Sequence, residues 1–187
     1  MSTIIIEGPD AVGKTTLVTA LQKHYGCASV KMKKEDTFDD VARAEVKAIH
    51  IAAMCKEHNM HCIFDRHWIS EICYGPLYHN RTDKDAEYIM DVIKGGLEET
   101  LNNLLYVICL PSEQDCLKLH EKSYLDRQED YKPDEQYQYL IKNYHQIYDD
   151  GMYDIEPLRL QKNVLRYDIT STSVDDMVKT IAERLDR

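Results

Sequence analysis

The sequence lacks the features that would direct it to a membrane or to long nucleic acid. It has no run of 18 apolar residues, and its first residues lead straight into an isoleucine-rich segment with no basic region before it. Its 23 lysines and arginines are outnumbered by 33 aspartates and glutamates and form no basic stripe, which leaves a formal net charge of -10. The lack of a long apolar run and of a basic leading region predicts a cytoplasmic protein without a membrane partner. Because long nucleic acid binds to clustered positive charge, we expect no long nucleic-acid partner. A small anionic ligand stays compatible with this charge.

The cysteines lack the spacing of a metal or disulfide site. No CxxC pair occurs, and several of the six cysteines fall inside apolar runs that are typical of strands or helices. Reduced, buried thiols are therefore expected rather than metal ligands or disulfides. The cysteines are Cys27, Cys55, Cys62, Cys73, Cys109 and Cys116.

What the sequence does contain is a regular alternation of strand and helix patterns. Short apolar runs predict five strands, at residues 3–7, 28–32, 62–65, 104–110 and 164–169. Helical apolar spacing recurs around residues 17–25, 46–53, 86–97, 137–148 and 174–185, and polar loops are expected at 31–40, 78–85 and 121–134. This alternation predicts an α/β three-layer fold, a five-stranded parallel sheet flanked by helices, in one domain over residues 1–187.

A phosphate-binding loop follows the first predicted strand. Residues 8–15, GPDAVGKT, fit the P-loop pattern GxxxxGK(S/T), and a predicted helix begins where the motif ends. Backbone N–H groups and the helix N-terminus would surround phosphate oxygens, Lys14 would neutralise the β and γ phosphates, and the Thr15 hydroxyl would ligate Mg²⁺. The nucleotide-binding residues expected in this loop are Gly8, Asp10, Ala11, Val12, Gly13, Lys14, Thr15 and Thr16.

A P-loop alone does not separate a motor, a switch GTPase and a small-molecule kinase. The guanine-specificity pattern NKxD is absent, which argues against a GTPase. A length of 187 residues also leaves no room for the additional domain that most motors need. A small-molecule kinase agrees best with these absences.

A second charged motif follows the third predicted strand. Asp65 and Arg66 come at the end of a short apolar run, so the carboxylate can hold the water shell of Mg²⁺ near Thr15. The adjacent guanidinium group can bind a second phosphate group through two hydrogen bonds. The alternative reading is a structural ion pair between Asp65 and Arg66.

With these residues in place, the sequence resembles the thymidylate kinase family of nucleoside monophosphate kinases. That family carries EGxDxxGK(S/T), DR(Y/F/H)xxSxxAY and LDRxE motifs. This chain carries EGPDAVGKT at residues 7–15, DRHWISEICY at 65–74 and LDRQE at 125–129, in the same order. A compact, divergent chain of this kind is also similar to the deoxynucleotide kinases that some viruses encode, for which the location would be the host cytoplasm.

The resemblance implies roles for residues around the acceptor nucleotide. Asp10 would accept a hydrogen bond from the deoxyribose 3′-hydroxyl, and Arg66 would hold the monophosphate. Ser70 and Tyr74 would border the acceptor nucleoside. Asp65 would serve the Mg²⁺ ion, with ATP as the phosphoryl donor.

The resemblance also implies a short mobile lid over about residues 118–134. Arg127 would reach the transferring phosphoryl group from this lid. The alternative is that Lys118, His120, Lys122 and Arg127 form the solvated face of one helix. Members of the family are commonly homodimers, so a homodimer is expected here.

The chain departs from the family where the family recognises its base. KMKKED stands at residues 31–36 in place of an REPG-type turn, and Phe38 and Arg43 lack the spacing of the family's FxxDR pattern. The base of the acceptor is therefore left open. Lys31, Lys33 and Lys34 have two readings, either as partners of the acceptor phosphate or as part of a solvated loop.

Aromatic residues divide into two groups by position. Trp68 and Tyr78 lie close to the second motif, and either is a candidate for stacking on the acceptor base. Tyr137, Tyr144 and Tyr148 lie at helical spacing, so we expect them to belong to the core with their hydroxyl groups reaching outward.

The predicted function is ATP-dependent phosphorylation of a (deoxy)nucleoside monophosphate, dTMP or a related dNMP, to the diphosphate. A monophosphate acceptor is already ionised at neutral pH, so Lys14, Arg66, Arg127 and Mg²⁺ suffice for alignment and charge neutralisation. One alternative is a deoxynucleoside kinase, which needs a carboxylate base near the second strand; Glu35 lies there, without that family's ERS motif. Another alternative is a regulator that binds nucleotide without transferring phosphate.

Overall fold

One parallel five-stranded sheet organises the molecule. The computed structural model describes residues 2–31, 38–82, 84–85, 87–88, 91, 104–127, 135–150 and 164–186. Within these residues the sheet has the strand order β2-β3-β1-β4-β5, and every strand pairs in parallel with its neighbours. The strands are β1 (Thr3–Glu7), β2 (Ser29–Lys31), β3 (Cys62–Asp65), β4 (Leu104–Cys109) and β5 (Val164–Tyr167).

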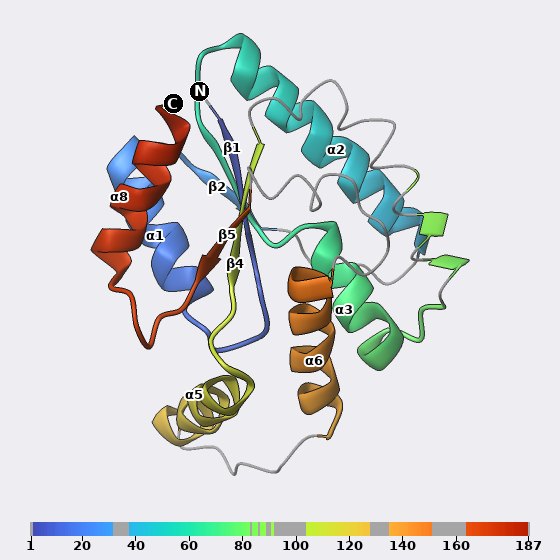
Figure 1. Ribbon diagram of the computed structural model, residues 1–187. Helices are drawn as coiled ribbons and strands as arrows, with labels where there is room; N and C mark the ends of the chain where they lie inside the picture. Colours follow the sequence, from blue (N-terminus) through green and yellow to red (C-terminus); the bar gives the residue numbers. More distant parts are fainter. Residues whose placement is uncertain are drawn as a thin grey trace.

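Helices cover both faces of this sheet (Figure 1). Helices α1 and α8 pack together on one face, whereas α2, α3 and α6 lie on the other, and α5 lies beyond the carboxyl ends of the strands. The helices are α1 (Lys14–Tyr25), α2 (Phe38–Glu57), α3 (Trp68–Tyr78), α5 (Glu113–Asp126), α6 (Glu135–Asp150) and α8 (Val174–Leu185). The predicted α/β three-layer fold is therefore confirmed.

The central strands explain why the sheet could be predicted. Ile4, Ile5 and Ile6 of β1 are buried, and so are all six residues of β4, because both strands are covered on two faces. The predicted bounds of β1 and β3 are confirmed, whereas β5 ends two residues early. It ends because the Asp168 carboxylate accepts hydrogen bonds from the backbone N–H and hydroxyl of Thr170, which turns the chain.

Predictions for the helices were less complete. Helices α3 and α5 were not predicted from periodicity, and the helix predicted around 86–97 falls largely outside the described residues. The loop prediction at 121–134 was wrong over its first part, since α5 continues to Asp126. Residues 118–126 of the expected lid thus belong to α5, and residues 128–134 lie outside the described part of the chain.

The core contains the side chains that the sequence assigned to it. Tyr137 and Tyr144 of α6 are buried, and Tyr148 packs partly buried against the core. The expectation that their hydroxyl groups reach outward is wrong for Tyr137 and Tyr144, whose hydroxyls contact the Asp10 carbonyl and the Ser70 hydroxyl, respectively. All six cysteines are free thiols, four of them buried and two half-buried, as predicted. Among the described helices, none has the length and apolar composition needed to cross a membrane.

Candidate active site

The P-loop connects β1 to α1 at the carboxyl edge of the sheet, and glycine is required at both of its ends. Gly8 has a φ angle of +137°, and a Cβ atom there would overlap the carbonyl oxygen of Cys109 in β4. Gly13 has a φ angle of +87°, and a Cβ atom there would lie 2.5 Å from Cδ1 of Ile169. The loop is therefore packed tightly between β4 and the turn that follows β5.

Lys14 begins α1 and is held inside the curve of the loop. Its side chain is buried, and Nζ donates a hydrogen bond to the Pro9 carbonyl oxygen. Burial lowers the pKa of Lys14 to about 8, and the positive charge of Arg66 contributes to this shift. A phosphate oxygen could replace the Pro9 carbonyl as the acceptor, which would restore a full charge on the lysine.

A pocket of about 540 Å³ opens next to the P-loop. It brings together P-loop residues, the two residues of the second motif and one side of α5. The described residues that line it are Asp10, Ala11, Gly13, Lys14, Thr15, Thr16, Lys31, Asp65, Arg66, Leu119, Lys122, Ser123, Asp126 and Ile169. The pocket therefore contains the P-loop lysine and hydroxyl and both residues of the Asp-Arg pair.

Arg66 is fixed in the pocket wall by contacts from two directions. Its Nη1 lies 3.3 Å from the Gly8 carbonyl oxygen and 3.2 Å from the Ser70 hydroxyl, and its Nη2 lies 3.1 Å from the Tyr74 hydroxyl. Nη2 also donates to the Asp10 carboxylate. The guanidinium carbon stands 4.7 Å from the centre of the Tyr74 ring, a cation–π contact.

Ser70 and Tyr74, predicted to border the acceptor nucleoside, thus both contact Arg66. Asp10, predicted to bind the sugar, forms an ion pair with Arg66. The carboxylate paired with Arg66 is thus that of Asp10 and not that of Asp65, which the alternative reading had paired with it. Asp65 instead has its carboxylate 3.9 Å from Lys31 Nζ.

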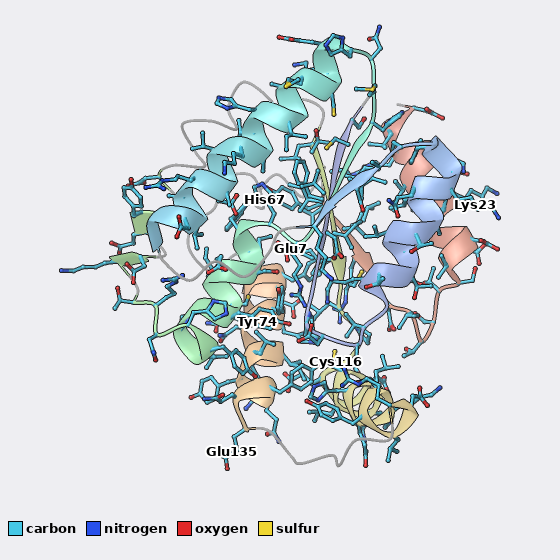
Figure 2. All side chains as sticks on the ribbon, turned by 180° about the vertical axis from the view of Figure 1, so that it is seen from behind. Glu7, Lys23, His67, Tyr74, Cys116 and Glu135 are labelled. Carbon is cyan, nitrogen blue, oxygen red and sulfur yellow. The ribbon has the colours of Figure 1, made fainter. Side chains whose placement is uncertain are left out.

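Glu7 is a buried residue that the motif analysis did not single out. Its Oε1 accepts hydrogen bonds from the backbone N–H groups of His67 (2.7 Å) and Ser70 (3.3 Å), at the N-terminus of α3. Its Oε2 accepts from the Ser70 hydroxyl at 2.6 Å, and the Tyr144 hydroxyl lies 3.0 Å from the same Ser70 oxygen. Figure 2 shows Glu7, His67 and Tyr74 close together where the sheet meets α3. Glu7 therefore caps α3 and joins the network that holds Arg66.

Two further buried pairs surround this network. His67 Nδ1 lies 3.1 Å from Oε2 of Glu45 in α2, and burial lowers the pKa of His67 to about 3 while it raises the pKa of Glu45. The His67 imidazole is therefore uncharged at neutral pH. Trp68 is buried, and its indole N–H donates to the Tyr106 hydroxyl at 3.0 Å. The expectation that Trp68 stacks on a base is wrong, because its ring belongs to the core.

The residues expected to bind Mg²⁺ fit that ion. The Thr15 hydroxyl and the Asp65 carboxylate are oxygen ligands that line the same pocket. Mg²⁺ typically takes one or two protein oxygens and completes its shell with phosphate and water. No group of three or more His, Cys, Asp or Glu side chains in the described residues could hold a metal by itself, so the nucleotide would supply the other ligands.

The side chains of two basic residues, Lys122 in α5 and Arg127 at its C-cap, point in different directions. Lys122 lines the pocket, whereas Arg127 is not among the described lining residues. The Arg127 guanidinium lies 4.8 Å from the Tyr124 ring centre, and its Nε donates to the Ser123 carbonyl oxygen at 3.1 Å. In this conformation the α5 cation that lines the pocket is therefore Lys122, which the sequence did not assign to the site.

Helix α6 contacts the P-loop directly. The Tyr137 hydroxyl donates to the backbone carbonyl oxygen of Asp10 at 2.7 Å, and the Tyr137 ring stacks on His120 of α5 with 3.7 Å between ring centres. The hydrogen bond between Tyr137 and Asp10 joins residues 127 positions apart. In the sequence, only the helical spacing of Tyr137 and Tyr144 indicated that these side chains point into the core. The backbone at Asp10 is thus anchored while its carboxylate stays exposed.

Comparisons with known proteins agree with this geometry at the level of fold. No protein-family model matches the sequence, and no curated protein sequence matches it significantly. The structure is similar to the YorR protein from Bacillus subtilis in complex with phosphorylated GDP, with a TM-score of 0.64 at 18% identity over 99% of this chain and 96% of that one. The chain has the fold of P-loop nucleoside and nucleotide kinases.

Deoxyadenosine kinase from M. mycoides is also similar to it. The structure with bound dATP has a TM-score of 0.57 at 18% identity, covering 99% of this chain and all of the other. The structure with dCMP and dCDP as products has a TM-score of 0.56 at 16% identity, covering 98% of each chain. At these identities the similarity extends to the fold alone.

Proposed function

We propose that this protein transfers the γ-phosphoryl group of ATP to a (deoxy)nucleoside monophosphate, dTMP or a related dNMP, and forms the diphosphate. The observation that carries the proposal is the presence of two cations, Lys14 and Arg66, in one pocket at the carboxyl edge of the sheet. Lys14 lies in the P-loop, where it would bind the donor phosphates, and Arg66 lies at the end of β3, where it would bind the acceptor phosphate.

The pairing of the pocket carboxylates supports a phosphate acceptor over a hydroxyl acceptor. A nucleoside kinase needs a carboxylate free to take the proton of the attacking hydroxyl group. Of the three aspartates among the described lining residues, Asp10 is paired with Arg66, Asp65 lies 3.9 Å from Lys31 Nζ, and Asp126 is the last residue of α5. The two aspartates of the motifs at the ends of β1 and β3 thus both face a cation. A monophosphate needs no such base, because its oxygens are already ionised at neutral pH.

In this proposal each residue binds or orients a phosphate. Thr15 and Asp65 would hold Mg²⁺, which disperses negative charge on the β and γ phosphates when it is bound. Lys122 and Arg127 would add positive charge from α5, Arg127 after a change of its side-chain direction. A homodimer and a cytoplasmic location belong to the same proposal.

A deoxynucleoside kinase is the second candidate, and the similarity to deoxyadenosine kinase structures favours it. Glu35, its candidate base, lies outside the described residues. The two candidates differ in the chemical group that they phosphorylate, so an assay that offers both kinds of acceptor separates them.

The deciding experiment is an acceptor panel with ATP and Mg²⁺. The four common deoxynucleosides, their ribonucleoside counterparts and all corresponding monophosphates are incubated with the protein, and products are separated by ion-exchange chromatography. We expect diphosphate from at least one monophosphate and no monophosphate from any nucleoside. Phosphorylation of nucleosides alone would favour the second candidate, and nucleotide binding without any product would favour a regulator.

Arg66→Ala links the activity to the pocket. Loss of a cation that binds the acceptor phosphate is expected to lower kcat/KM for the monophosphate by about a hundredfold or more. Arg184→Ala is the matched control, because Arg184 lies in the last turn of α8, at the edge of the sheet opposite the P-loop (Figure 1). Equal losses in both variants would contradict the assignment of Arg66.

A further inference from the structure

The guanidinium group of Arg66 has little hydrogen-bonding capacity left for a ligand. An arginine carries five N–H donors, one on Nε and two on each Nη. Nη1 contacts the Gly8 carbonyl and the Ser70 hydroxyl, and Nη2 contacts the Tyr74 hydroxyl and the Asp10 carboxylate. Within the described part of the chain, only the Nε–H is left over. A phosphate that takes two hydrogen bonds from Arg66 must therefore displace one of these partners.

Asp10 is the partner that can leave. Its side chain is 56% exposed, whereas the Arg66 side chain is 19% exposed. Ser70 is buried and bonded to Glu7, and the Gly8 carbonyl belongs to the backbone of the loop. The Tyr137 hydroxyl holds the Asp10 backbone, so departure requires only rotation of the Asp10 side chain.

Departure of Asp10 would leave a two-point binding site. Nε and Nη2 share one edge of the planar guanidinium group, so the Nε–H and the released Nη2–H can bind two phosphate oxygens side by side. A phosphate carries more negative charge than one carboxylate and matches this geometry, so it can replace Asp10. A neutral nucleoside brings no anion and leaves the ion pair intact.

We propose that the ion pair between Asp10 and Arg66 is a gate that selects acceptors carrying a phosphate. The inference rests on the proposed function and adds to it, because one displacement both exposes Arg66 and frees the Asp10 carboxylate. The freed carboxylate can then accept a hydrogen bond from a sugar hydroxyl of the same acceptor. Phosphate binding and sugar recognition would therefore form together, and Asp10 is a specificity-determining residue.

Inorganic phosphate tests the gate without any phosphoryl transfer. Its binding is measured by isothermal titration calorimetry with Mg²⁺ and a non-hydrolysable ATP analogue present, so that the donor site is filled. Asp10→Asn removes the competing charge and is expected to tighten phosphate binding about fivefold, the size expected for a partly exposed ion pair. Asp10→Ala should change the affinity in the same direction.

Two controls separate the gate from a general effect of charge. Asp40→Asn removes the same charge from an aspartate that pairs with another arginine, Arg43, and is not among the described lining residues, so it is expected to change phosphate affinity by less than about twofold. Asp10→Asn should have no effect when Arg66 is already alanine. Unchanged phosphate affinity in Asp10→Asn, equal gains in both asparagine variants, or a gain that persists without Arg66 would each overturn the proposal.

Failure of the gate and failure of the proposed function give different results. If Asp10→Asn tightens phosphate binding but the acceptor panel yields no diphosphate, the gate stands and the kinase activity does not. If diphosphate forms but phosphate affinity is the same with and without the Asp10 carboxylate, the kinase activity stands and the gate is wrong.

Discussion

At the scale of single residues, burial controls how the site responds to pH. Burial raises the pKa of Glu7 to about 7, although its contacts with Ser70, Arg66 and His67 oppose the shift. Burial also raises the pKa of Glu45 and lowers that of His67. The two carboxyl groups therefore favour the folded state at low pH, whereas His67 favours it at higher pH.

Glu7→Gln isolates one of these contributions. The folded protein holds the Glu7 proton up to about pH 7, whereas the unfolded chain releases it near the ordinary value of 4.5. The stabilisation by this proton is complete below pH 4.5 and is lost as the pH rises through 7. The difference in unfolding free energy between wild type and Glu7→Gln should therefore fall by roughly 3 kcal/mol over this interval.

Urea unfolding at several pH values between 4 and 8 measures this difference. Glu121→Gln serves as the control, because Glu121 is exposed on α5, and its profile should follow that of the wild type. Parallel profiles for wild type and Glu7→Gln would show that folding does not shift the pKa of Glu7. The glutamine variant should also raise the acceptor KM, since its amide N–H₂ would compete with Arg66 for the Ser70 oxygen.

Residues within one motif were predictable, and residues that meet only in the folded chain were not. Lys14 and Thr15 were assigned from a contiguous pattern, and Asp65 and Arg66 from their place after a strand; all four line the pocket. The ion pair between Arg66 and Asp10 joins residues 56 positions apart, and no local pattern encodes it. For Glu7, the available signals were its place as the first residue of the EGxDxxGK(S/T) motif and its charge at the end of a buried isoleucine run.

At the scale of elements, α5 determines which of its cations face the pocket. Lys122 and Ser123 face the pocket, whereas Lys118 pairs with Asp115 one turn earlier on the same helix, at 3.1 Å. The helix is fixed at its start by the Ser112 hydroxyl, which accepts a hydrogen bond from the Asp115 N–H.

Lys122→Ala is expected to lower kcat by about tenfold or more, because it removes positive charge beside the phosphates. Lys118→Ala is the matched control on the same helix and should stay within about twofold of wild type. Steady-state kinetics with saturating ATP and the best acceptor of the panel measures both. A loss of the same size in Lys118→Ala would indicate that α5 acts through its overall charge and not through a side chain in the pocket.

Strands and helices were predictable from the sequence where their buried residues form a regular apolar pattern. Strands β1 and β4 are buried on both faces and appear in the sequence as continuous apolar runs. Helix α3 was missed because it contains Gly75 and Pro76, and α5 was missed because its buried residues are only Cys116 and His120. Helix α5 therefore has no apolar stripe long enough to be recognised without its neighbours, whereas α3 has one in Trp68, Ile69, Ile72 and Cys73 that stops at Gly75 and Pro76.

At the scale of the whole molecule, a local positive site lies on a protein with a net charge of -10. Long-range electrostatics oppose the approach of anionic substrates, so binding depends on the contacts in the pocket and on the counterion. Nucleotide binding should therefore stabilise the folded chain only when Mg²⁺ is present.

Thermal unfolding tests this dependence. At ATP concentrations about a hundredfold above Kd, binding adds about 2.7 kcal/mol of stability, which corresponds to a Tm increase of about 5–10 °C for a chain of this size. This increase in Tm should be lost when EDTA removes Mg²⁺, and it should also be lost in the Lys14→Ala variant. An equal increase with EDTA would mean that Thr15 and Asp65 do not hold a metal ion together with the nucleotide.

Trp68 gives the molecule an internal optical reporter. It is the single tryptophan of the chain, it lies two residues after Arg66, and its indole N–H is bonded to Tyr106 in β4. Any movement of Arg66 or of the start of α3 during acceptor binding changes the environment of this one fluorophore. Stopped-flow measurement of native fluorescence can therefore time such a movement without a label.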